Sequence, residues 1–157
     1  MLSILSVTGL TMDESLGVPV VILSGSDSSR SLRLPVHPME AGAIAMALSG
    51  QNTAASYPTD LSLNILSAFN ATLEKSVIHD FRNGAVCARL DLVADGERFL
   101  VECRPADAII LSLRMACQLC VEESVFIKLN GEGSVAENLR RHIAGIDTMS
   151  FGDCIIS

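Results

Sequence analysis

The sequence predicts an α+β protein, because hairpin signals and strand-length segments precede helices that begin with proline. Residues 99–103 alternate between apolar and polar side chains, with Phe99, Val101 and Cys103 on one side. This period is typical of a half-buried strand. Pro105 follows and begins a mostly apolar stretch without a helix breaker, and proline is well tolerated at the first helical position. A strand therefore turns sharply into a helix at Pro105.

The remaining elements follow from the same signals of period, capping and turn chemistry. Asp95-Gly96 is a strong hairpin signal, and Asn83-Gly84 marks another turn. In chain order, strands are expected at residues 4–10, 18–23, 31–36, 73–78, 85–93, 99–103, 118–121 and 125–128. Helices are expected at residues 39–48, 61–69, 106–115 and 134–144, and a turn is expected at residues 79–82.

Length and composition indicate one domain with more apolar surface than its own core needs. The chain has 157 residues, of which 49% are hydrophobic, and a net charge of −7. No run reaches the ~18 apolar residues of a membrane span, so we expect no membrane association and a homodimer or higher homo-oligomer. The start of the chain lacks secretory signal features, and its five cysteines, an odd number, indicate reduced thiols. A cytoplasmic protein is therefore expected.

Two parts of the chain resemble each other at an offset of 67 residues. Pro38 corresponds to Pro105, and Glu40 corresponds to Asp107 as an acid two residues after the proline. The order of a hairpin, a strand and a proline-led helix also occurs twice. The identical residues are too few to establish an internal duplication, and the shared order of elements is the better evidence for one.

Four segments resemble the bifunctional nuclease family of bacteria and plants. They are residues 34–45, 58–61, 83–88 and 104–109. The last segment, Arg104-Pro105-Ala106-Asp107-Ala108-Ile109, is the most specific. The resemblance covers roughly residues 1–128, and we expect residues 129–157 to pack on the same domain as a helix and a tail. It implies an α+β fold with a large mixed, mostly antiparallel sheet, pairing of subunits, and cleavage of DNA and RNA.

The chain departs from the family in three of these segments. Val86-Cys87-Ala88 stands where the family usually has an aromatic-rich Phe-Tyr-Ala strand. Thr59 is followed directly by Asp60, whereas the family usually has a histidine between the threonine and the aspartate. Ala106 stands where the family usually has serine. The missing histidine would be an obvious proton carrier or metal ligand. His37 directly precedes a helix and is close to Glu40 in sequence, so it is the candidate substitute and a candidate substrate-binding residue.

Three carboxylates and one arginine are the candidate catalytic residues. Metal-assisted phosphodiester hydrolysis needs hard oxygen ligands for Mg²⁺ or Mn²⁺. We therefore expect Glu40 and Asp107 as metal ligands and Asp60 as a further catalytic carboxylate. Arg104 is expected to clamp a phosphate oxygen with its planar fork. Glu102 is expected near the substrate, either as an added ligand or as the partner of Arg104.

The same residues also have purely structural interpretations. An acid in the first turn of a helix stabilises it by ~0.3–1 kcal/mol without any further role, and Asp60 fits a helix cap. Cys117 and Cys120 form a C-x-x-C pattern, which we interpret as buried thiols. Two functions stay open. One is a metal-dependent nuclease without an organic cofactor. The other is a non-enzymatic dimeric interaction or regulatory module, which the acidic net charge and the absent histidine favour.

Overall fold

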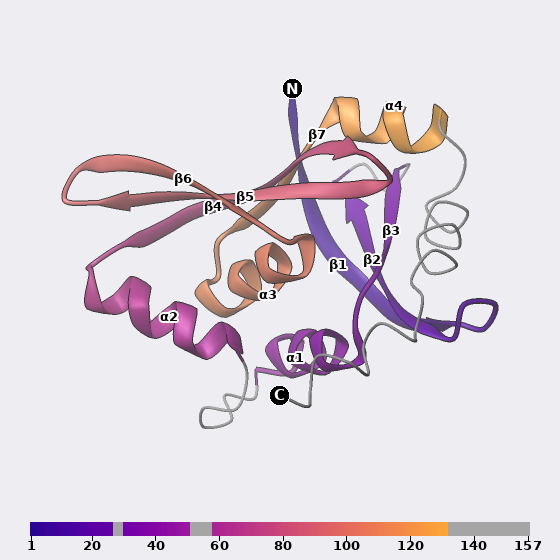
Figure 1. Cartoon of the computed structure of the whole chain (residues 1–157), viewed down its shortest axis with the longest axis horizontal. Coiled ribbons are helices and arrows are strands. Elements are labelled where there is room, and N and C mark those ends of the chain that lie inside the picture. Colours follow the sequence, from indigo (N-terminus) through magenta and orange to yellow (C-terminus); the bar gives the residue numbers. More distant parts are fainter. Residues whose placement is uncertain (27–29, 51–57, 132–157) are drawn as a thin grey trace, which may run out of the picture.

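The computed structural model describes residues 1–26, 30–50 and 58–131, and Figure 1 shows their arrangement. Within these ranges, seven strands form one sheet in the order β3-β2-β1-β7-β4-β5-β6, and helices pack against it. The neighbouring strands are antiparallel except for β4 and β7, which are parallel. The predicted α+β fold with a large, mostly antiparallel mixed sheet is confirmed.

A unit of three antiparallel strands followed by a helix occurs twice, on either side of β7. The first unit consists of β1 (Leu2–Asp13), β2 (Val18–Gly25), β3 (Ser31–Pro35) and α1 (Pro38–Leu48). The second unit consists of β4 (Thr72–Arg82), β5 (Ala85–Ala94), β6 (Glu97–Cys103) and α3 (Pro105–Met115). The other elements are α2 (Pro58–Ala68), β7 (Gln118–Glu122) and α4 (Glu123–Gly131). The repeated order of elements seen in the sequence is therefore present in the structure.

Both hairpin turns of the second unit have the backbone that their sequences predict. Asp95 and Gly96 have φ angles of 52° and 81°, and Asn83 and Gly84 have φ angles of 53° and 79°. Two consecutive positive φ angles match the twist of the adjoining strands, and Asn, Asp and Gly adopt them most readily. These turns place β5 beside β4 and β6 beside β5.

The core lies between the sheet and the helices α1 and α3. Each of these helices has a proline in its first turn, and α3 packs against α1, β4 and β5. Ile44 of α1 and Ile109 of α3 are fully buried, as are Leu23 and Ile78 of the sheet. Burying a side chain of this size stabilises the fold by about 1.5–3 kcal/mol. This packing fixes the first turns of α1 and α3 relative to each other.

Strand β6 is far more exposed than its alternating sequence predicts. The exposed fractions of Phe99, Leu100 and Val101 are 49%, 67% and 42%, and only Cys103 is partly covered. In the described part of the chain, β6 is the last strand of the sheet and pairs with β5 alone. The prediction of a half-buried strand is wrong, because a period of two shows which side chains share a face but not whether another element covers that face.

Two short segments differ from the expected secondary structure. Residues 79–82, expected as a turn, continue β4, and a register shift between Ile78 and Asp80 accommodates them. Residues 125–128, expected as a strand, belong to α4, because a short apolar run cannot distinguish a helix from a strand. The expected helix at residues 134–144 and the tail lie outside the described residues. No helix in the described ranges is long and apolar enough to cross a membrane.

Candidate functional site

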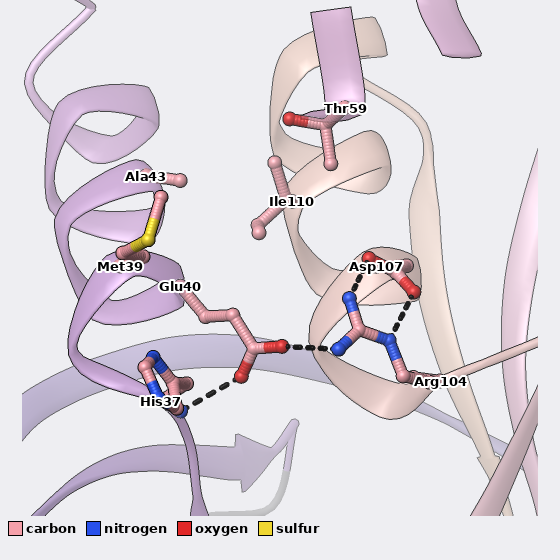
Figure 2. Close-up of a pocket in the computed structure, with 8 residues that line it drawn as sticks. All are labelled: His37, Met39, Glu40, Ala43, Thr59, Arg104, Asp107 and Ile110. Carbon is pink, nitrogen blue, oxygen red and sulfur yellow. Dashed lines mark hydrogen bonds and ion pairs between the residues drawn. The ribbon is translucent and has the colours of Figure 1, made fainter. Parts of the chain in front are cut away.

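Three helices contribute their first turns to one hollow of about 220 Å³. Figure 2 shows the lining residues, which are His37, Met39, Glu40, Ala43, Thr59, Arg104, Asp107 and Ile110. His37 and Arg104 occupy equivalent positions in the two units, because each directly precedes the first residue of its helix, α1 or α3. Thr59 belongs to the first turn of α2. The hollow therefore exists only where the two units and α2 meet.

Arg104 contacts carboxylates from both units (Figure 2). Its Nε and Nη2 atoms lie 2.8 and 2.9 Å from the two carboxylate oxygens of Asp107, and its Nη1 atom lies 2.8 Å from Oε1 of Glu40. The hydrogen bond to Asp107 raises the pKa of Arg104 above its usual value. The Arg104 side chain is nevertheless 68% exposed. A charged guanidinium is thus held in place and is still accessible to a ligand.

Glu40 uses its two carboxylate oxygens differently. Oε2 accepts a hydrogen bond of 2.8 Å from the backbone N–H of His37, while Oε1 contacts Arg104. An acid at the third helical position pairs with the cap N–H, which has no partner inside the helix. Glu40 therefore stabilises the start of α1 with one oxygen and connects α1 to the second unit with the other.

A second hollow, of about 380 Å³, adjoins the first. Glu40 and Arg104 line both hollows. The rest of the second hollow is formed by the end of β3, the turn at Gly84 and the first turn of α3, and its side chains there are apolar. The ion pair between Glu40 and Arg104 therefore lies at the boundary between the two hollows. The second hollow is otherwise largely apolar, whereas the first is also lined by Asp107 and Thr59.

Comparison with known proteins identifies the family of this chain. A model of the bifunctional nuclease domain matches residues 21–132, a range that contains all the residues lining the two hollows. The chain belongs to the bifunctional nuclease domain family. It is also 29% identical, over 119 residues, to two uncharacterized proteins of Mycobacterium tuberculosis, one from strain CDC 1551 / Oshkosh and one from strain ATCC 25618 / H37Rv. The alignments cover 76% of this chain and 71% of each relative.

Two of the expected site residues of this bifunctional nuclease domain lie elsewhere. Asp60 is paired with Arg114 at 2.9 Å and is absent from the lining of both hollows. Glu102 is paired with His79 at 3.0 Å, so the expectation that it joins Arg104 is wrong. The reason is that Glu102 projects from β6 and its side chain reaches across β5 to β4, rather than toward the first turn of α3. The structure therefore brings together His37, Glu40, Arg104 and Asp107 from the expected set.

As they stand, the residues of the hollow do not fit a divalent cation. Mg²⁺ or Mn²⁺ would use the oxygens of Glu40 and Asp107, but Arg104 engages both carboxylates. Among the residues that the structure describes, no three His, Cys, Asp or Glu side chains are grouped so that they could hold a metal ion. A cation could reach these two carboxylates only where Arg104 has left at least one of them.

Three cysteines of the domain, Cys103, Cys117 and Cys120, are poorly suited to nucleophilic chemistry. Burial raises the pKa of Cys103 to about 12, and burial also raises the pKa values of Cys117 and Cys120. The reactive form of cysteine is the thiolate, so these thiols are protonated and unreactive at neutral pH. Cys120 is buried, which confirms the interpretation of its thiol as buried. Cys117 is only partly buried, so the interpretation is confirmed in part for this residue.

Among the polar residues that line the hollow, Thr59 has the weakest functional signal in the sequence. In sequence it is a candidate helix cap, because threonine directly before a helix commonly has that role. In the structure it lies inside the first turn of α2, and its side chain forms part of the wall of the hollow. Its place in the segment that resembles the family, directly before Asp60, is the one feature that singles it out.

Proposed function

We propose that this protein hydrolyses phosphodiester bonds of nucleic acid at the hollow between α1, α2 and α3. The observation that carries the proposal is the exposed guanidinium of Arg104, held at the boundary of two hollows by carboxylates from both units of a bifunctional nuclease domain. Membership of the family supports a nuclease-related function. The geometry supports this hollow as its location.

In this proposal Arg104 binds the phosphate. A guanidinium presents N–H donors in a planar fork that matches two phosphate oxygens. In the protein alone these donors are directed at Asp107 and Glu40, so a phosphate competes with the two carboxylates for them. The net charge of −7 opposes a polyanion at long range, but exposed charges are largely screened beyond about 8 Å at physiological ionic strength. Contacts within the hollow therefore decide whether a phosphate binds.

Glu40 is the proposed general base. When a phosphate oxygen takes the Nη1 donor of Arg104, Oε1 of Glu40 loses its partner. Glu40 then accepts a proton from a water molecule, whose oxygen bonds to phosphorus while the bond to the leaving oxygen breaks. His37 lines the same hollow and is the proposed source of the proton for the leaving oxygen. Arg104 stabilises the negative charge that develops on the phosphoryl oxygens.

Cleavage of labelled DNA and RNA, each single- and double-stranded, tests the proposal. Each substrate is incubated with Mg²⁺, with Mn²⁺ and with a chelator. The chelator is included because no step described above depends on a bound cation. Glu40→Gln retains an oxygen that can accept the helix-cap hydrogen bond but cannot serve as the base. We expect this variant to cleave at least about a hundredfold more slowly than the wild-type protein.

Glu74→Gln is the matched control, because Glu74 is an acid that pairs with Arg98 on the surface, outside the hollow. This control is expected to cleave at the wild-type rate. Undiminished cleavage by a Glu40→Ala/Asp107→Ala double variant would show that the chemistry takes place elsewhere. If the wild-type protein cleaves none of the substrates under any of the three conditions, the proposed hydrolysis is wrong.

A non-enzymatic dimeric module is the second candidate, and exposed apolar side chains favour it. Large apolar residues are exposed on α2, directly after α2 and on β6. They are Leu61, Ile65, Phe69, Phe99, Leu100 and Val101. An edge strand with an apolar centre can pair with a strand of another chain. We therefore propose a homodimer in which β6 of one subunit contacts β6 of its partner.

The oligomeric state of a charged variant tests this pairing. Leu100→Lys should shift the mass measured by light scattering from dimer toward monomer, because it places a charge in the proposed interface. Ile127→Lys is the control, since Ile127 is 73% exposed on α4 and away from β6. A wild-type monomer, or a Leu100→Lys dimer as stable as the wild type, would contradict the pairing. A stable dimer without cleavage would favour the non-enzymatic module.

A further inference from the structure

The second hollow, which Arg104 also lines, has no role in the hydrolysis described above. Its volume of about 380 Å³ lies within the range of about 300–1,000 Å³ that is usual for small-molecule sites in proteins. The two units form it together, because β3 and α1 contribute one part of the wall and β5 and α3 contribute the other. Ala85 on this wall is exposed, as is Arg104, so a ligand can enter from solvent.

The wall of this hollow is charged on one side only. Glu40 and Arg104 lie at its boundary with the first hollow, and the other described residues of the wall, such as Pro35, Val86 and Pro105, have apolar side chains or none. An apolar wall favours a group that gains by leaving water. A ligand that fits the charges as well as the wall therefore has an anionic end and an apolar end.

We propose that the second hollow binds the base of the nucleotide whose phosphate is bound by Arg104. The phosphate at Arg104 rests on the proposed function, and the further inference is the part of the nucleic acid that the adjoining space accepts. A nucleotide has a negative phosphate at one end and a flat ring with apolar faces at the other, joined by a sugar. Because Arg104 lines both hollows, a phosphate at its guanidinium leaves the base beside the apolar wall.

This placement defines the class of nucleic acid that would be cleaved. In a duplex each base is paired and stacked, and it can enter a pocket only after it has rotated out of the helix. A single strand needs no such step, so single-stranded nucleic acid is the expected substrate. In the described lining, the side chains that can form hydrogen bonds are those of Glu40 and Arg104, and the proposed hydrolysis uses both at the phosphate. The hollow therefore accepts bases without reading their identity.

Binding of adenosine 5′-monophosphate and of ribose 5-phosphate to the whole chain tests for a base subsite. The two ligands share the sugar and the phosphate, and only the first has a base. We expect the nucleotide to bind about tenfold more tightly, because its ring buries apolar surface against the wall. Titrations followed by protein NMR measure both affinities. In the wild-type protein, the nucleotide alone should shift the backbone amide signals of Ala85 and Val86.

A variant that fills the hollow tests where the base lies. Ala85 is the first residue of β5 and forms part of the wall, so Ala85→Leu occupies the space of the base. It should lower the affinity for the nucleotide to that for ribose 5-phosphate and leave the affinity for ribose 5-phosphate unchanged. Ala94→Leu is the matched control, because Ala94 is at the other end of β5 and is absent from the lining of both hollows. It should bind both ligands as the wild-type protein does.

The outcomes distinguish this subsite from the proposed hydrolysis. Equal affinity of the wild-type protein for the two ligands, or binding of neither, overturns the base subsite, whatever cleavage is observed. A preference for the nucleotide that persists in Ala85→Leu, without shifts at Ala85 and Val86 in the wild-type protein, also overturns it, because the base then lies elsewhere. If the preference is lost in Ala85→Leu alone but nucleic acid is not cleaved, the subsite is supported and the hydrolysis is wrong.

Discussion

Arg104 is the residue on which the geometry of the site depends. It makes two hydrogen bonds to Asp107 and one ion pair to Glu40, and so it connects the starts of α3 and α1. Ion pairs this exposed to solvent contribute only about 0–1 kcal/mol to stability. Replacing Arg104 should therefore change the chemistry of the hollow far more than it changes the stability of the fold.

Removal of Arg104 should make the two carboxylates available to a cation. We expect Arg104→Gln to bind Mn²⁺ more tightly than the wild-type protein, because Glu40 and Asp107 lose their positively charged partner. Titration calorimetry with Mn²⁺ measures this difference. Arg98→Gln is the control, since Arg98 lies on the surface outside the hollow. Equal Mn²⁺ affinity in the wild-type protein and Arg104→Gln would show that Arg104 and the cation do not compete.

The raised pKa of Cys103 leads to a separate prediction about the reactivity of a single residue. Its pKa is raised from 9.0 to about 12 by burial, so its thiolate fraction at pH 8 is about a thousandfold lower than that of an unfolded cysteine. Peptide-resolved alkylation with iodoacetamide should therefore label Cys103 very slowly in the native protein and rapidly in urea. Rapid native labelling would contradict the burial of this thiol.

The same shift affects stability at high pH. Between pH 9 and about pH 12 the unfolded chain loses the Cys103 proton while the folded protein keeps it. The unfolded state then binds fewer protons than the folded state, so the stability contributed by this group is full below pH 9 and declines as the pH rises toward 12. Cys103→Ala should show a smaller decline in unfolding free energy over this range.

At the scale of elements, local chemistry accounts for what the sequence predicts well. Pro38 and Pro105 mark the starts of α1 and α3, and the dipeptides at Asn83 and Asp95 mark two hairpin turns. These signals act within a few residues, so they can be interpreted without knowing the fold. The exposure of β6 could not be predicted in the same way, because it depends on whether an element distant in sequence packs over that strand.

The turn between β5 and β6 gives a test of this local control. Gly96 has a φ of +81°, and a Cβ atom added there would meet no other atom within 4 Å. The cost of Gly96→Ala is therefore purely conformational, and we expect a loss of about 1 kcal/mol in the free energy of unfolding in urea. Gly96→Asn should lose less, because asparagine tolerates positive φ. Equal stability of Gly96→Ala and the wild-type protein would contradict this conformation of the turn.

At the scale of the whole molecule, the candidate site is a product of the repeated architecture. The two units lie on either side of β7, and their helices α1 and α3 pack together, so that Glu40 comes within 2.8 Å of Arg104. The offset of 67 residues between Pro38 and Pro105 indicates equivalent turns, but it does not show that the turns face each other. The pairing of Asp60 with Arg114 likewise depends on the packing of α2 against α3. Such long-range contacts have no local signal, which explains why only part of the expected site is assembled.

We propose that nucleic acid is cleaved at the hollow around Arg104. The most direct test is the single-turnover cleavage rate of Arg104→Gln beside that of Arg98→Gln, on a substrate that the wild-type protein cleaves. Loss of a group that stabilises transition-state charge typically costs about 10²–10³ in rate. We predict that Arg104→Gln is slowed to this extent while Arg98→Gln cleaves at the wild-type rate. Equal cleavage by both variants would contradict cleavage at this hollow.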